Sequence, residues 1–167
     1  MNPNMRNEKL REVFVGLGFE NVRTVITTGN VLFESPSSSI QKFESQLEAA
    51  WSRELGFTST TIIRSKKQIQ DLLQRGALTS LARSHPDDVD VTFLKRRPPT
   101  IPRLPYQPHD RSFKVVALDE VTLGSVVDPK SPRPSDHYRW IEKQFGKEVT
   151  TRTIKTVGRI LQRLEED

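Results

Sequence analysis

The sequence contains no cysteine and no long apolar run, and each absence excludes a class of function. Without cysteine among its 167 residues, the chain can form neither a disulfide nor a zinc–thiolate site, and it has no thiol nucleophile. No segment approaches the roughly 18 uninterrupted apolar residues that a membrane span requires, and the polar opening MNPNMRNEKLREVF is unlike a signal peptide. We therefore expect a cytoplasmic globular protein with no membrane partner.

The familiar motifs of nucleotide and metal sites are also absent. Neither GxGxxG nor GxxxxGK[ST] occurs, and the chain has no HExxH pair and no EF-hand loop. The three histidines lie far apart in the sequence, at His85, His109 and His137. The carboxylates show no spacing typical of a catalytic pair. We expect no metal and no cofactor, and the pattern identifies no catalytic residue, which leaves open whether the protein is an enzyme.

The chain carries a surplus of basic residues, and their distribution is more informative than the total. The formal net charge is +5 and the sequence pI is about 9.7, which fits the profile of nucleic-acid binders and is also common among soluble proteins. The basic residues gather in two stretches: Lys95, Arg96, Arg97 and Arg103, then Lys147, Arg152, Lys155, Arg159 and Arg163.

The hydrophobic pattern predicts an α+β fold with mostly antiparallel sheets. In the first part of the chain we expect helices over 4–18, 40–55 and 65–76, a hairpin over 22–35 that turns at Thr28-Gly29-Asn30, and a strand over 58–64. In the second part we expect strands over 88–94, 112–118 and 121–127, then a helix capped by Ser135 and a last helix from about Thr153. Proline-rich connectors separate these elements.

Weak periodicity between Gly76 and Asp88 predicts a boundary between two small lobes. We place the first lobe at 1–84 and the second, with the C-terminal helices, at 85–167.

The stretch EVTTRTIKT, residues 148–156, is our main site prediction. A helical projection from Ile154 separates an apolar stripe from a basic stripe that includes Arg152 and Lys155. The simplest interpretation is a solvated basic face preceded by one threonine as N-cap. The functional alternative is an anion held at the helix start by Thr151, Arg152, Thr153 and Lys155, because free N–H groups and the dipole favour negative charge there.

Three segments resemble a bacterial family, the domain of unknown function numbered 1697. They are MRNEKLREVFVGLGFENVRTVITTGNVLFES, TSTTIIRSKKQIQDLL and FGKEVTTRTIKTVGRIL. The resemblance covers most of the chain; GFxNVRTxxxxGNVxF and TTRTxKTV are its most specific parts. It implies a two-lobe α+β fold whose first lobe is ferredoxin-like, it implies no activity, and it is the reason to consider Gly29 and Asn30 as ligand contacts.

The resemblance also implies an apolar strand and a glycine-containing turn before this sequence begins. A ferredoxin-like lobe has the order β-α-β-β-α-β, and residues 4–64 supply only the last five of these elements. We expect the natural protein to carry an upstream strand, which translation of the upstream DNA would test. A lobe that lacks it would expose a sheet edge and favour self-association.

Two functions follow as hypotheses. The first is a non-enzymatic protein that binds an anionic ligand, a nucleic acid or a phosphorylated small molecule, at the start of the C-terminal helix. The alternative is an enzyme of unknown reaction whose site lies between the lobes.

Overall fold

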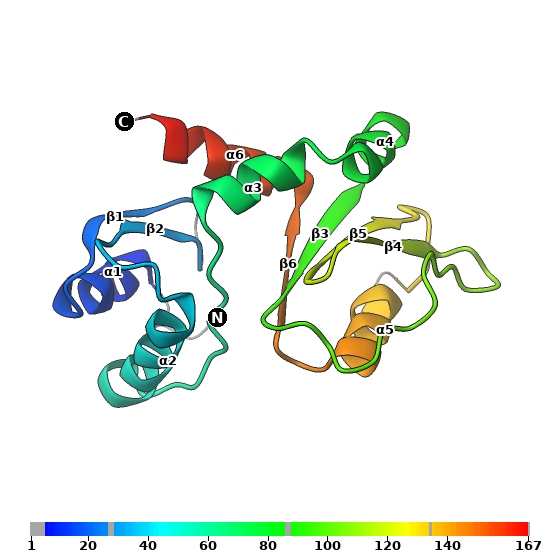
Figure 1. Cartoon of the computed structure of the whole chain (residues 1–167). Helices are drawn as coiled ribbons and strands as arrows, with labels where there is room; N and C mark the ends of the chain where they lie inside the picture. The colour runs from blue at the N-terminus through cyan, green and yellow to red at the C-terminus, as the bar shows by residue number, and fades with distance from the viewer. Residues whose placement is uncertain (1–5, 27–28, 86–87, 134, 167) are drawn as a thin grey trace. The chain divides into compact units, whose positions relative to one another are not determined.

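The computed structural model describes residues 6–26, 29–85, 88–133 and 135–166. The chain divides into two compact units: a first unit of residues 1–64 with 162–167, and a second unit of residues 65–161. Helices and antiparallel sheets occur in both, which confirms the predicted α+β class (Figure 1). The division at 64/65 differs from the lobe boundary that we expected near 84, because α4 (Gly76–Ser84) packs its Leu81 against Gly124 of the second unit.

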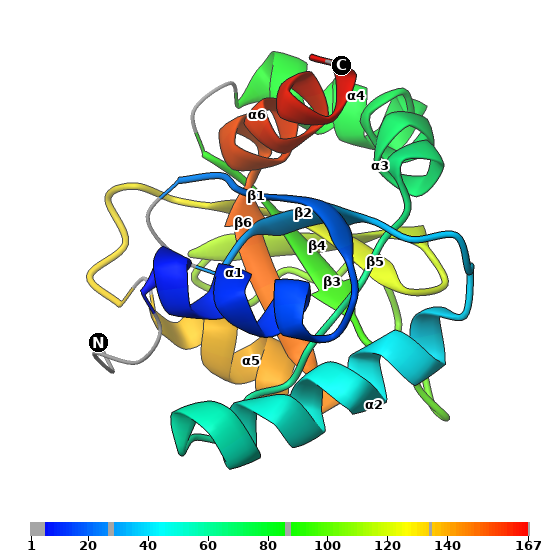
Figure 2. The same cartoon turned by 90° about the vertical axis from the view of Figure 1, so that its left-hand side faces the viewer.

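The first unit has the order helix, strand, strand, helix that the sequence predicted. Its elements are α1 (Asn7–Gly16), β1 (Glu20–Thr24), β2 (Val31–Glu34), α2 (Ile40–Ala50) and the π-helical turn η2 (Trp51–Leu55). Figure 2 turns α1 and the antiparallel β1–β2 pair toward the viewer. The core is mainly aromatic; Phe19 contacts Phe33 at 4.6 Å and Phe43 at 5.0 Å between ring centroids. Leu47 of α2 is fully buried beside them.

The predicted strand over 58–64 is wrong. The segment from 57 to 65 joins no sheet. Its backbone is held instead by two carboxylates one turn apart on α2: Thr61 N–H donates to Glu48 Oε1 at 2.8 Å, and Ile63 N–H donates to Glu44 Oε1 at 3.0 Å. Alternating threonine and isoleucine favour an extended backbone, but side chains rather than a neighbouring strand satisfy these N–H groups.

The second unit is built on a four-stranded antiparallel sheet with the order β4-β5-β3-β6. Its elements are α3 (Lys66–Leu73), α4, β3 (Val89–Leu94), β4 (Phe113–Asp119), β5 (Thr122–Val127), α5 (Ser135–Phe145), β6 (Val149–Thr153) and most of α6 (Ile154–Glu165). The sequence predicted neither α4 nor the pairing of β6 with β3. Ser65 and Gln68 form a capping box at the start of α3, which confirms the predicted cap.

Two helices of the second unit contact opposite faces of this sheet. Tyr138 of α5 donates its hydroxyl hydrogen bond to Asp90 of β3. The strand register places Ser125 of β5 opposite Asp90, on the α5 face. Gly124, one residue earlier, faces the other way and meets α4.

Candidate functional site

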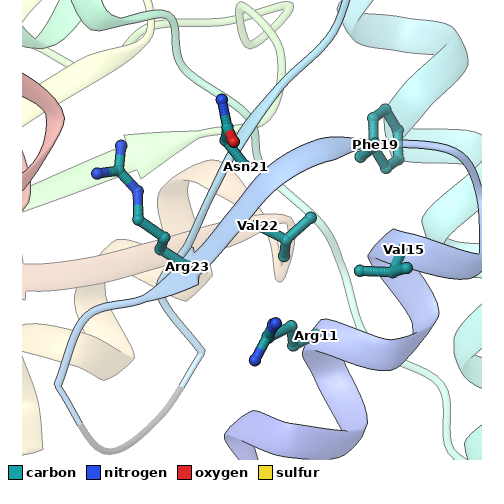
Figure 3. A pocket seen from close by; sticks show the side chains of 6 residues that line it. All are labelled: Arg11, Val15, Phe19, Asn21, Val22 and Arg23. Carbon is teal, nitrogen blue, oxygen red and sulfur yellow. The ribbon is translucent and has the colours of Figure 1, made fainter. Parts of the chain in front are cut away.

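A pocket of about 490 Å³ lies in the first unit, beside β1 (Figure 3). Its walls come from α1 and from the chain that enters and forms β1, and the lining residues are Arg11, Val15, Phe19, Asn21, Val22 and Arg23. A volume of this size falls in the range of small-molecule sites, about 300–1,000 Å³.

The helical wall follows from the periodicity of α1. Leu10, Val13 and Phe14 form the buried stripe of this helix. Arg11 and Val15 lie four residues apart and therefore share a different face. Val15 is 55% exposed in spite of its apolar side chain, so α1 presents a cationic and an apolar group side by side to the pocket.

The strand wall contains a β-bulge. The β1–β2 register shifts between Glu20 and Arg23, and Asn21 has a φ of 47°, a left-handed conformation that asparagine tolerates better than most residues. Asn21 Nδ2 donates a 2.9 Å hydrogen bond to Glu34 Oε2 of β2. Bulges re-aim side chains and recur beside functional sites.

Figure 3 shows the result of this geometry. Asn21 and Arg23 point to one side of the β1 ribbon, whereas Val22 points to the other side, where Arg11 and Val15 of α1 lie. The pocket therefore runs along β1. Asn21 and Arg23 are the polar groups on one side of the strand, and Arg11 lies on the other side with the apolar residues Val15 and Val22.

The polar lining is cationic although the unit around it has no surplus of basic residues. The first unit, residues 1–64 and 162–167, contains eight basic and ten acidic residues, yet the lining includes two arginines and no carboxylate. A guanidinium presents planar N–H donors that match the oxygens of a carboxylate or phosphate. This lining is suited to an anion.

The predicted site residues Thr151 and Arg152 point to opposite faces of β6. Thr151 Oγ1 is 2.8 Å from Thr92 Oγ1 of β3, on the α5 side. Arg152 Nη1 donates to Thr150 Oγ1 and to the Thr151 carbonyl, each at 2.8 Å. The helical projection of Arg152 is wrong, because residues 149–153 form a strand and the helix begins only at Ile154. Burial lowers the pKa of this guanidinium.

Thr153 and Lys155 both lie at the start of α6. The Thr156 N–H donates to Thr153 Oγ1 at 3.2 Å, and the two hydroxyls are 3.0 Å apart. Thr153 is therefore the N-cap that we expected as the simplest interpretation. Lys155 is exposed.

Gly29 and Asn30 belong to the first unit, in the β1–β2 turn, and Thr28 of that predicted turn lies outside the described residues. Gly29 has a φ of 72°, as a tight turn requires. Asn30 bonds back across the hairpin to Val25 through its carbonyl and its side-chain amide.

A second polar cluster lies beneath α5. His137 and Ser125 are fully buried, and neither the imidazole nitrogens nor the serine hydroxyl has a hydrogen-bond partner among the described residues. Burial lowers the pKa of His137 to about 4 and raises the pKa of Asp90. A neutral histidine packed against Phe113 at 5.6 Å between ring centroids is a core residue of this unit.

No group of three metal-ligating side chains occurs in the part of the chain that the structure describes. No helix among the described residues is long and apolar enough to cross a membrane.

The pocket residues were not singled out by the sequence. Arg11 and Arg23 are twelve positions apart and fit no motif. The available signal was indirect: Asn21, Val22 and Arg23 fall within GFENVRT, one of the stretches most specific to the resemblance.

Fold and pocket together define a two-unit α+β protein with a cationic pocket in its first unit. A family model described as "Protein of unknown function (DUF1697)" matches residues 2–118. The chain belongs to the DUF1697 family.

A solved structure supports the fold. It is described as the structure of conserved bacterial protein SP0830 from Streptococcus pneumoniae, and it is 18% identical with a TM-score of 0.71. The alignment covers 99% of this chain and 94% of the other. A search of curated proteins gave no match.

Proposed function

We propose that this protein binds a small anionic ligand, a phosphorylated or carboxylated molecule, in the pocket beside β1. The observation that carries the proposal is the composition of the lining: Arg11 and Arg23 come from different elements, and no acidic residue shares the pocket with them. Asn21 adds an amide at a bulge. Hydrogen bonds to charged groups contribute about 1.5–3 kcal/mol each.

Calorimetric titration with inorganic phosphate, pyrophosphate and acetate tests this proposal. We expect saturable binding of at least one anion, and we expect Arg11→Gln to weaken it about tenfold or more, in line with the loss of one charge-assisted bond. Arg53→Gln is the matched control, since Arg53 is also an exposed arginine of the first unit but bonds Glu54 outside the pocket. Equal loss in both variants, or no binding of any anion by the wild type, would refute the site.

The start of α6 stays a second candidate for an anion, with nucleic acid as the ligand. Its support is the charge of the second unit: residues 65–161 carry eighteen basic and eleven acidic residues. Of the four predicted residues, Thr153 and Lys155 are exposed at the start of this helix. Phosphate contacts make log affinity fall linearly with log salt concentration, so single-stranded DNA binding that is salt-sensitive and weakened by Lys155→Ala, but not by Arg11→Gln, would favour this candidate. The enzyme alternative stays a prediction without a named residue.

A further inference from the structure

Val15, which lines the pocket, is an exposed apolar residue of α1, whereas the apolar stripe of the same helix is buried. Leu10, Val13 and Phe14 are at most 5% exposed, whereas Val15 of the same helix is 55% exposed, the most of the large hydrophobic side chains that the structure describes as exposed. A single exposed valine is ordinary on a protein surface. Its position in a cationic pocket is what gives it a specific meaning.

Val15 lies beside two further apolar lining residues, Phe19 and Val22, and the three form an apolar strip in the pocket. Val22 and Phe19 line the pocket while being only 9% and 7% exposed, so their accessible atoms face the pocket from the core. In Figure 3, Val22 points toward Val15, and Arg11 lies one helical turn before Val15 on α1. Charge and apolar surface are therefore adjacent in one pocket.

We propose that the ligand is an amphipathic anion, a single phosphate or carboxylate group that carries a short alkyl or aryl part. This inference rests on the proposed function and specifies it. Arg11 holds the charged group, and the apolar part covers Val15 and the edge of Val22. A small inorganic anion would leave that strip in water, whereas an attached hydrocarbon removes apolar area on both molecules from water.

The energetic expectation is a gain with hydrocarbon length. Each methylene that becomes buried raises affinity by about three- to fourfold. The pocket is limited in size, so the gain should stop after a few carbons. The comparison series is inorganic phosphate, methyl phosphate, butyl phosphate and phenyl phosphate, titrated by calorimetry at one pH and one ionic strength.

Val15→Thr is the decisive variant, because threonine keeps the branched shape and replaces a methyl group by a hydroxyl. We expect inorganic phosphate to bind Val15→Thr and the wild type equally, and butyl phosphate to lose most of its advantage. Ile101→Thr is the matched control: Ile101 is 53% exposed but belongs to the second unit, and its replacement should change neither affinity.

The outcomes separate the two proposals. If inorganic phosphate and butyl phosphate bind with equal affinity, the amphipathic ligand is refuted and the anion site stands. If neither the phosphates of this series nor pyrophosphate nor acetate binds, both are refuted. An advantage of butyl phosphate that survives in Val15→Thr contradicts the assignment to this wall. Binding to phosphatidic acid vesicles without binding to any soluble ester would show a lipid surface as the partner and overturn the small-molecule ligand.

Discussion

The two units differ most in what fills their cores. In the first unit, rings dominate, with Phe14, Phe19, Phe33, Phe43 and Trp51 in mutual contact. In the second unit, three fully buried polar side chains lie where α5 packs on the sheet: Thr92 of β3, Ser125 of β5 and His137 of α5. The first unit also buries a polar side chain, Glu44 of α2. Aromatic rings bury a large area per residue, which suits a unit with only a short two-stranded sheet. Because burial lowers the pKa of His137, we expect the stability of the second unit to depend on pH.

The two units also differ in charge, and the pocket does not lie in the more basic one. The second unit has the surplus of basic residues, whereas residues 1–64 are balanced. The pocket nevertheless lies in the first unit, where its lining contains two arginines and no carboxylate. The sequence placed our candidate site at the start of α6, on its threonines, Arg152 and Lys155, and did not indicate the pocket beside β1.

The largest expected effect comes from removing a core side chain in one unit alone. Leu47→Ala should destabilise the first unit by about 3 kcal/mol, because a fully buried leucine leaves a cavity. The chain has one tryptophan in each unit, Trp51 and Trp140. Urea unfolding should therefore shift for Trp51 fluorescence, measured in a Trp140→Phe background, and stay unchanged for Trp140 fluorescence, measured in a Trp51→Phe background.

Ile141→Ala is the mirror experiment, since Ile141 of α5 is 1% exposed in the second unit. It should shift the Trp140 transition alone. If either substitution moves both transitions equally, the two units unfold as one cooperative body and the comparison fails.

The next effect separates the cores by pH. The pKa of His137 is lowered to about 4 from an ordinary value of 6.5, so between these values the unfolded chain binds a proton that the folded unit excludes. Stability of the second unit should therefore be complete above pH 6.5 and fall as pH drops toward 4, by at most about 3 kcal/mol, with a slope of up to about 1.4 kcal/mol per pH unit.

Urea unfolding at several pH values, followed by Trp140, measures this slope. His137→Leu should abolish this loss of stability toward pH 4, and the Trp51 transition should not show the loss in either protein. Asp90 works in the opposite direction because burial raises its pKa, but it is present in both proteins, so their difference isolates His137. A loss of stability toward pH 4 that is equally large in His137→Leu contradicts the assignment.

Local signals in the sequence predicted most of the fold, and long-range pairing explains where they failed. The apolar spacing of α2 and the Ser65 cap needed only neighbours along the chain. The strand β6 depends on a distant partner, because VTTRT pairs with β3, and the paired residues Thr151 and Thr92 are 59 positions apart. The segment from 58 to 64 has the same β-branched character, yet buried Glu44 takes the place of a strand neighbour.

The pocket could not be predicted for a related reason. Its geometry depends on a positive φ at Asn21 and on a register shift, and neither leaves a periodic pattern in the sequence. The proximity of α1 to β1 could be inferred from their order, but not which side of β1 each residue would face. Thr151 and Arg152 are the opposite case. They are neighbours in the sequence, but their side chains point to opposite faces because successive side chains of a strand alternate.

The smallest expected effect concerns the start of α6. Thr153→Ala removes the oxygen that accepts the Thr156 N–H, and loss of an N-cap costs about 1 kcal/mol. Because α6 begins in the second unit, the loss should appear in the Trp140 transition, and Thr153→Ser should restore it by keeping the hydroxyl. An unchanged Trp140 transition in Thr153→Ala would mean that the hydroxyl adds nothing to folding, which would return Thr153 to consideration as a ligand contact. If Thr153→Ala loses stability and Thr153→Ser restores it, the hydroxyl serves as the cap of α6. The second candidate site then depends on Lys155.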